Sequence, residues 1–150
     1  MAHSFISSLF HCVFSTKDRR KIINAELQER LWPYLGGIAR SNDMKALAVG
    51  GVEDHVHLLL SLPSMLAPAK AMQLIKANST KWIHETYRDQ AAFCWQEGYG
   101  AFSIGKSQVD PTIVYIRTQA EHHRKNSFQE EFLAFLKKHE IDYDPRYVWG

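Results

Sequence analysis

Alternating polar and apolar positions mark a short strand near the middle of the chain, over residues 55–62. In an extended chain, Val56 and Leu58 point to one face and His55 and His57 to the other. Side chains on one face lie about 6 to 7 Å apart, so the two imidazoles would face one small volume, as a divalent metal requires. The same pattern also fits a half-buried strand whose polar face merely includes two histidines.

Further strands and helices are predicted on both sides of this strand. Apolar and β-branched runs predict the other strands, which span residues 4–15, 44–52 and 99–104. Apolar residues spaced three and four apart predict the helices, which span residues 24–41, 69–87, 110–123 and 128–139. This order predicts an α+β fold, the ferredoxin-like split βαβ sandwich, in which helices cover one face of an antiparallel sheet and a C-terminal helix follows.

The predicted helices have recognisable start signals. Asn24 and Ser127 are suitable N-caps, and Asp110-Pro111 combines an N-cap with proline at the first helical position. Pro33 and the Gly36-Gly37 pair weaken the first helix and predict a kink or a break there.

Length and composition are those of a soluble globular protein. The 150 residues predict one domain over 1–150, and 45% of them are hydrophobic. No apolar run approaches the roughly 18 residues of a membrane span, and the start has no signal-peptide pattern. The sequence therefore predicts a cytoplasmic protein, whose aromatic tail over 143–149 should pack against the body.

The positive charges are clustered although the net charge is only +2. Between His55 and His84 there are three lysines and no acid, and four basic residues lie within residues 17–21. Such local surfaces can neutralise phosphates, although solvated faces of a helix and a turn would look the same.

Residues 100–107 match the phosphate-binding loop pattern G-x-x-x-x-G-K-[ST]. That loop requires a buried strand before the first glycine and a helix that begins at the lysine. Here the interior of the pattern is itself predicted as a strand, and the helix signal comes only at Asp110. We therefore expect no nucleotide-binding loop.

The third predicted helix separates a tyrosine from its apolar stripe. Ile113 and Ile116 fall on one face, whereas Tyr115, Gln119 and His122 fall on nearly the opposite face. An amphipathic helix that simply has a tyrosine on its polar side would show the same pattern.

Three segments together resemble the single-tyrosine HUH transposases of bacterial insertion sequences, which are IS200-like, and the related REP-associated tyrosine transposases. They are His-Val-His at 55–57, Tyr-Ile-Arg-Thr-Gln at 115–119 followed by Glu-His-His at 121–123, and Trp-Gln-Glu-Gly-Tyr-Gly-Ala-Phe-Ser at 95–103. The resemblance extends over essentially the whole chain.

The resemblance implies a metal-assisted transposase. His55 and His57, with Gln119 as third ligand, would bind Mg²⁺ or Mn²⁺. Tyr115 would attack single-stranded DNA to give a 5′-phosphotyrosine and a free 3′-OH, and His122 or His123 could assist proton transfer.

The resemblance further implies a homodimer that recognises DNA hairpins, with no membrane and no nucleotide cofactor. From charge and position we expect DNA contacts from Arg19, Arg20, Lys70, Lys76, Lys81 and Trp82. Two other functions remain open from the sequence. One is a metal-dependent single-strand nuclease in which water attacks, and the other is a non-catalytic nucleic-acid-binding module of the same fold.

Overall fold

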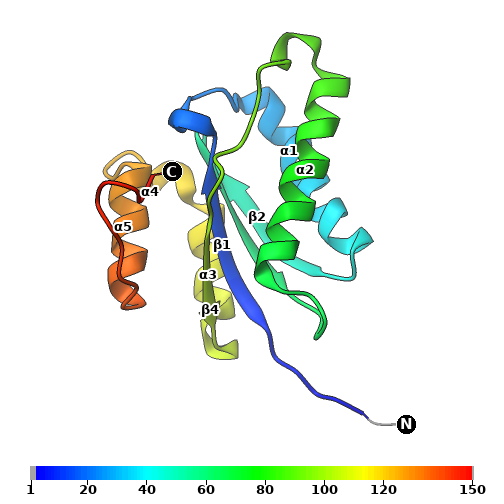
Figure 1. Cartoon of the computed structure of the whole chain (residues 1–150), viewed down its shortest axis with the longest axis vertical. Coiled ribbons are helices and arrows are strands. Elements are labelled where there is room, and N and C mark those ends of the chain that lie inside the picture. The colour runs from blue at the N-terminus through cyan, green and yellow to red at the C-terminus, as the bar shows by residue number, and fades with distance from the viewer. Residues whose placement is uncertain (1–2, 150) are drawn as a thin grey trace.

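Four antiparallel strands form the centre of the molecule, in the order β2-β3-β1-β4 (Figure 1). In this computed structural model, which describes residues 3–149, β1 (Leu9–Ser15) pairs with β3 (His55–Ser61) and with β4 (Gly100–Ile104). The edge strand β2 (Lys45–Gly51) pairs with β3 in the predicted hairpin. The α+β class and the sheet are therefore confirmed.

Two long helices, α1 (Ala25–Ser41) and α2 (Pro68–Thr86), cover one face of the sheet (Figure 1). Val56, Leu58 and Leu60 of β3 point into this layer and are fully buried. Burial of each such side chain contributes about 1.5–3 kcal/mol, so the alternation fixes which face of β3 the histidines occupy. His55 and His57 point to the other face, as the pattern predicted.

That other face is covered by α3 (Val109–Arg117), α4 (Gln119–His122) and α5 (Phe128–Lys138) (Figure 1). The third predicted helix thus lies with the C-terminal helix and not with the first two. Ile116 packs on Leu59 of β3, and Phe132 packs on Val13 of β1. Both contacts place these helices beside the histidines.

Gly50 allows α3 to lie unusually close to β2. A Cβ atom at this position would come within 2.6 Å of the Ile116 carbonyl oxygen, which is backbone and cannot move aside cheaply. Gly50 also pairs with His57 across the hairpin. The glycine therefore sets how closely the segment around Tyr115 approaches β3.

The third predicted helix differs most from expectation. It begins at Val109, with Gln108 as N-cap, so Asp110 lies inside its first turn and does not cap it. It also ends at Arg117, because Thr118 has φ −109° and ψ 29°. The side-chain amide of Gln119 donates to the Tyr115 carbonyl oxygen at 3.1 Å, replacing the Gln119 N–H of a continuous helix.

The other boundaries deviate less. β1 begins at Leu9 and not at residue 4, and α1 runs unbroken through Pro33 and the glycine pair, so the predicted break does not occur.

The segment that matches the phosphate-loop pattern has a different structure. Its residues 100–104 form β4, and a short 3₁₀ helix, η3 (Lys106–Gln108), follows. In the tail, Trp149 packs near Phe128, whereas Tyr147 is exposed.

The remaining elements are the 3₁₀ turns η1 (Lys17–Arg19) and η2 (Arg88–Gln90). Within residues 3–149, no helix has both the length and the apolar character needed to cross a bilayer.

Candidate active site

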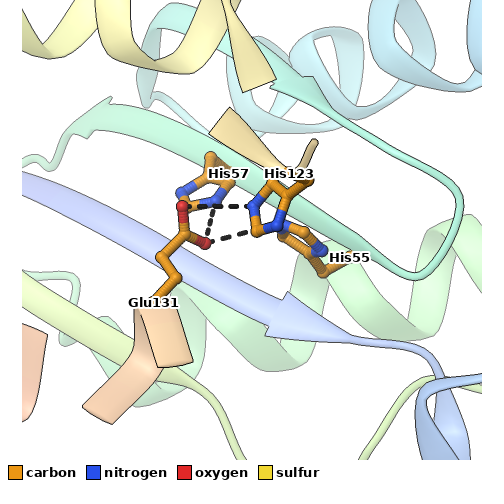
Figure 2. A group of neighbouring side chains, drawn as sticks. All are labelled: His55, His57, His123 and Glu131. Atoms are coloured by element: carbon orange, nitrogen blue, oxygen red, sulfur yellow. Dashed lines mark hydrogen bonds and ion pairs between the residues drawn. The ribbon is translucent and has the colours of Figure 1, made fainter. Parts of the chain in front are cut away.

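His55 and His57 lie side by side on the face of β3 beneath α5. Both are fully buried, and their ring centroids are 5.1 Å apart. The Nε2 atoms of both rings point toward the same carboxylate oxygen, Oε1 of Glu131, at 3.4 Å from His55 and 2.9 Å from His57 (Figure 2). The alternation of β3 therefore delivers two imidazole nitrogens to one point, as a metal site requires.

Glu131 of α5 and His123, which follows α4, complete this group. Oε2 of Glu131 lies 3.2 Å from Nε2 of His123 (Figure 2). One donor atom from each of the four residues lies within 4.8 Å of the others. Three imidazoles and one carboxylate are donors suited to a divalent metal ion.

The outer nitrogens of the two strand histidines have separate partners. Nδ1 of His55 lies 2.6 Å from Oδ1 of Asp54, and Nδ1 of His57 lies 2.7 Å from Nε2 of His11 on β1. If each Nδ1–H donates to these partners, each Nε2 keeps a lone pair for a metal. The structure thus contains the supporting contacts that metal-binding histidines usually have.

The neighbouring carboxylates set the protonation of the histidines in this cluster. Burial alone would lower the pKa of His55, but Asp54 and Glu131 outweigh it and raise the pKa to about 9. Burial would raise the pKa of Glu131, but hydrogen bonds from His123, His55 and His57 hold it far below its usual range. Burial and the nearby His57 lower the pKa of His11 to about 3.

These shifts predict a stability maximum for the metal-free protein near pH 6.5. His11 stays neutral when folded but binds a proton when unfolded, so stability should rise from pH 3 to 6.5. The charged form of His55 is favoured in the folded protein, so its contribution is complete below pH 6.5 and is lost as the pH rises to about 9. We expect this loss to be on the order of 2 kcal/mol by urea unfolding.

If His55 is a metal ligand, saturating Mn²⁺ should remove the loss of stability above pH 6.5, because the bound metal would keep His55 neutral in the folded protein. A decline of the same size with and without Mn²⁺ would contradict this assignment of His55.

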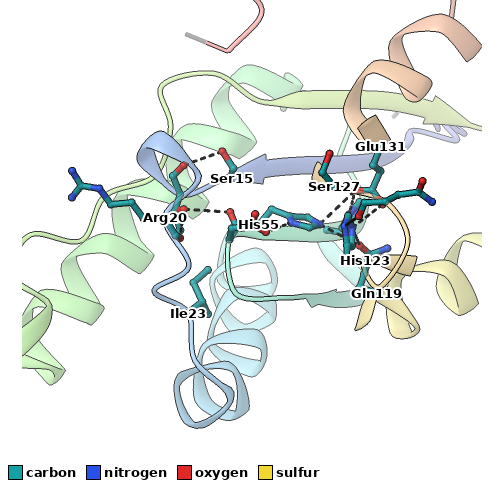
Figure 3. A network of polar contacts seen from close by, with 12 residues as sticks. Ser15, Arg20, Ile23, His55, Gln119, His123, Ser127 and Glu131 are labelled. Atoms are coloured by element: carbon teal, nitrogen blue, oxygen red, sulfur yellow. Dashed lines mark hydrogen bonds and ion pairs between the residues drawn. The ribbon is translucent and has the colours of Figure 1, made fainter. Parts of the chain in front are cut away.

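Tyr115 and Gln119 reach the same cluster. The Tyr115 hydroxyl donates a hydrogen bond to Oε2 of Glu131, and its ring centroid lies 5.7 Å from that of His57. Burial and the hydrogen bond to Glu131 raise the pKa of Tyr115 above its usual value. Oε1 of Gln119 lies 3.3 Å from Nε2 of His55 and 3.0 Å from Nε2 of His123 (Figure 3). One chain therefore brings together all four residues expected at the centre of the site.

The two histidines expected in proton transfer occupy different positions. His123 belongs to the cluster itself, and its Nδ1 is 2.7 Å from the Asn126 carbonyl oxygen. The His122 ring lies beside Tyr115, with centroids 4.5 Å apart, and its Nε2 is 3.2 Å from Oγ1 of Thr118.

The expected DNA contacts fall into two groups. Lys70, Lys76 and Lys81 are on α2, across the sheet from the histidines. The Lys76 ammonium donates to three carbonyl oxygens of residues 96–98, and burial lowers its pKa to about 8, which indicates a structural contact. Trp82 is half-buried and already stacks on a tyrosine ring.

Arg19 and Arg20 lie nearer the cluster. Their loop, marked by Arg20 in Figure 3, is fixed to the turn before His55. The contact is a hydrogen bond from the Thr16 N–H to the Asp54 carbonyl oxygen at 2.9 Å. Arg19 lines a hollow of about 620 Å³ together with Asp54 and His123, and Arg20 is exposed. The first basic loop is therefore the predicted contact region closest to the site.

Sequence reasoning missed Glu131, His11 and Asp54. Glu131 occupies the apolar stripe of α5, one position before Phe132, and an acid on a buried helix face is a signal that could have been used. His11 has the same strand parity as Val13, which places it on the histidine face.

Comparison with known proteins identifies the family. The model of the family described as "Transposase IS200 like" matches residues 4–119, most of the chain. The chain belongs to the IS200-like transposase family. That match contains His55, His57, Tyr115 and Gln119, and Glu131 lies beyond its end.

A curated relative and two solved structures are similar to this IS200-like transposase. The ISDra2 transposase TnpA of Deinococcus radiodurans is 23% identical over 115 residues, covering 73% of this chain and 82% of that protein. A crystal structure of a D. radiodurans R1 protein described as a transposase has a TM-score of 0.64 at 18% identity, covering 78% of this chain and 97% of that one. A REP-associated tyrosine transposase bound to a REP hairpin has a TM-score of 0.56 at 15% identity, covering 77% and 68%. These two structures support the fold.

Proposed function

We propose that this IS200-like transposase cleaves and rejoins single-stranded DNA at hairpin-marked ends through a 5′-phosphotyrosine on Tyr115. The observation that carries the proposal is the shared carboxylate. Glu131 accepts the Tyr115 hydroxyl on one oxygen and lies against His55 and His57 with the other. Nucleophile and candidate metal donors therefore border one volume within one chain.

The donor set fits Mg²⁺ or Mn²⁺. His55 and His57 would hold the ion through Nε2, with Gln119 Oε1 as the third ligand and Glu131 Oε1 as an additional oxygen donor. No cysteine is within the four-residue donor group, which argues against a thiolate-bound structural zinc. The oxygen donors of Gln119 and Glu131 are the ligands that suit Mg²⁺ or Mn²⁺. When bound, the metal would polarise and orient the scissile phosphate.

The chain's own residues perform the transfer. The Tyr115 oxygen forms a bond to phosphorus as the bond from phosphorus to the 3′ oxygen breaks, which leaves a 3′-OH after protonation. We assign proton movement to His122, beside the tyrosine ring, and to His123, in the cluster. The phosphotyrosine keeps the energy of the broken phosphodiester, so a second 3′-OH can reverse the step without ATP.

We propose hairpin-bearing single-stranded DNA as the partner, by analogy with the REP-associated tyrosine transposase that was solved with a REP hairpin. Exposed Arg20, Lys70 and Lys81, together with Arg19, are proposed to contact phosphates. We also propose a homodimer, as the resemblance implies, although one chain already brings Tyr115 to the histidines.

The experiment is a cleavage assay with Mn²⁺ and a pool of hairpin oligonucleotides labelled at the 3′ end. We expect the label to migrate with the protein on a denaturing gel, because the 5′-phosphotyrosine joins the labelled 3′ fragment to the chain. Labelled fragments that are released without protein would indicate the water-attacking nuclease, and binding without cleavage of the cognate hairpin would indicate a binding module.

His11 is expected to support metal binding through His57. His11→Phe keeps an aromatic ring against Phe135 but removes the acceptor for His57 Nδ1, so Mn²⁺ affinity should fall by about 10- to 100-fold in isothermal titration calorimetry. His11→Gln retains a hydrogen-bonding group and should recover part of that affinity. Equal affinities in wild type and His11→Phe would remove His11 from the metal's support.

A further inference from the structure

Tyr115 also lines a hollow on the side of β4, separate from the hollow that Arg19 lines. It has a volume of about 530 Å³ and lies among β4, α3 and the end of α5. Tyr115, Thr112 and Gln108 line it from α3 and the turn before it, and Phe135 and His139 line it from α5 and the residue that follows. Hollows of this size commonly accept small organic groups.

The charge of this hollow suits a nucleic-acid strand. Its lining includes Lys138 and His139, and none of the lining residues in the described part of the chain is acidic. The other hollow beside Tyr115, about 300 Å³ in volume, shares Lys138 and includes His122, but it is also lined by the acidic Glu130 and Glu131. A negatively charged strand that leaves Tyr115 would therefore be favoured on the β4 side.

The aromatic groups of the hollow suit a nucleobase. Phe102 is nearly parallel to Phe135, with centroids 5.2 Å apart and an interplanar angle of 20°, and nearly parallel to His139, at 4.9 Å and 26°. Gln108 and Thr112, which line the hollow from η3 and α3, supply hydrogen-bonding groups. Flat rings together with polar groups are what a base with a π-face and a polar edge needs.

The proposed chemistry indicates which nucleotide of the DNA strand would place its base in this hollow. A 5′-phosphotyrosine joins Tyr115 to the nucleotide on the 3′ side of the cleaved bond, so that nucleotide must stay beside the tyrosine ring. We infer that the hollow between α3 and α5 over β4 holds the base of this first 3′ nucleotide. The inference rests on the proposed function and adds to it a subsite that positions the covalently bound strand.

The test combines protein variants with a base deletion in the DNA. Affinities are measured by fluorescence anisotropy in a Tyr115→Phe background, for a cognate hairpin strand with and without an abasic site at the first 3′ nucleotide. Thr112→Trp narrows the hollow, whereas Val114→Trp places the same ring on an exposed part of α3 that does not line it.

Base removal should weaken binding about tenfold in the parent and in Val114→Trp, and should have little further effect in Thr112→Trp. His139→Ala, which removes a stacking ring without adding bulk, should shrink the same penalty. A penalty that is absent in the parent, or equal in all variants, overturns the subsite. The wild-type protein, incubated with the same strand and Mn²⁺, separates the two claims. If it forms a DNA adduct on Tyr115 and the penalty is absent in the Tyr115→Phe background, only this inference fails. If the wild-type protein forms no adduct on the cognate strand, the proposed function fails as well.

Discussion

Tyr115→Phe is expected to abolish DNA cleavage, with a loss of roughly 10⁴-fold or more in rate, because the substitution removes the oxygen that we propose as the nucleophile. The ring itself should remain in place, since it packs edge-on against Phe135 and His57. Mn²⁺ affinity and hairpin affinity should therefore stay close to those of the wild type. The rate of labelled strand cleavage, the calorimetric affinity for Mn²⁺ and the fluorescence-anisotropy affinity for the hairpin measure these three properties.

The matched control is Tyr34→Phe, which removes a hydroxyl from a tyrosine stacked on Trp82, on the other side of the sheet. This variant should cleave normally. Cleavage that persists in Tyr115→Phe at the wild-type rate would mean that water is the nucleophile.

Glu131→Ala is expected to cause the largest loss of stability. The carboxylate is buried and pairs with His57, His123 and the Tyr115 hydroxyl, so its removal leaves these polar groups without their common partner. Breaking a buried ionic contact of this kind costs about 3–5 kcal/mol. At about 2–4 °C per kcal/mol, the thermal midpoint of the metal-free protein should fall by roughly 6–20 °C.

Glu130→Gln is the control for this prediction. Glu130 is the exposed neighbour that completes the capping box with Ser127, and glutamine can make the same contact. Its thermal midpoint should shift by less than about 2 °C. An equally small shift in Glu131→Ala would show that the cluster does not depend on the carboxylate.

Local patterns predicted the parts of the site that each lie on one element. The period of two along β3 placed His55 and His57 on one face, and the spacing of the third helix separated Tyr115 from Ile116. These predictions need only the periods of a strand and a helix, which fix the residues that share a face and can be recognised in a few consecutive residues.

The remaining parts depend on tertiary packing. Glu131 reaches the histidines because α5 lies across the second face of the sheet, and no local pattern specifies where a C-terminal helix docks. The interruption at Thr118 likewise follows from the inward position of the Gln119 side chain, which is stabilised by contact with His55. For the same reason, the contact between Lys76 and residues 96–98 could not be read from charge alone.

Peptide mapping of the covalent complex by mass spectrometry tests most directly whether Tyr115 is the nucleophile. After incubation with Mn²⁺ and a cognate hairpin strand, the protein is digested with protease and nuclease, and the modified peptide is sequenced. We expect a nucleotide attached through its 5′ phosphate to Tyr115, and no such adduct when the metal is chelated. An adduct on another residue, or complete cleavage with no adduct on any peptide, would contradict the assignment of Tyr115 as the nucleophile.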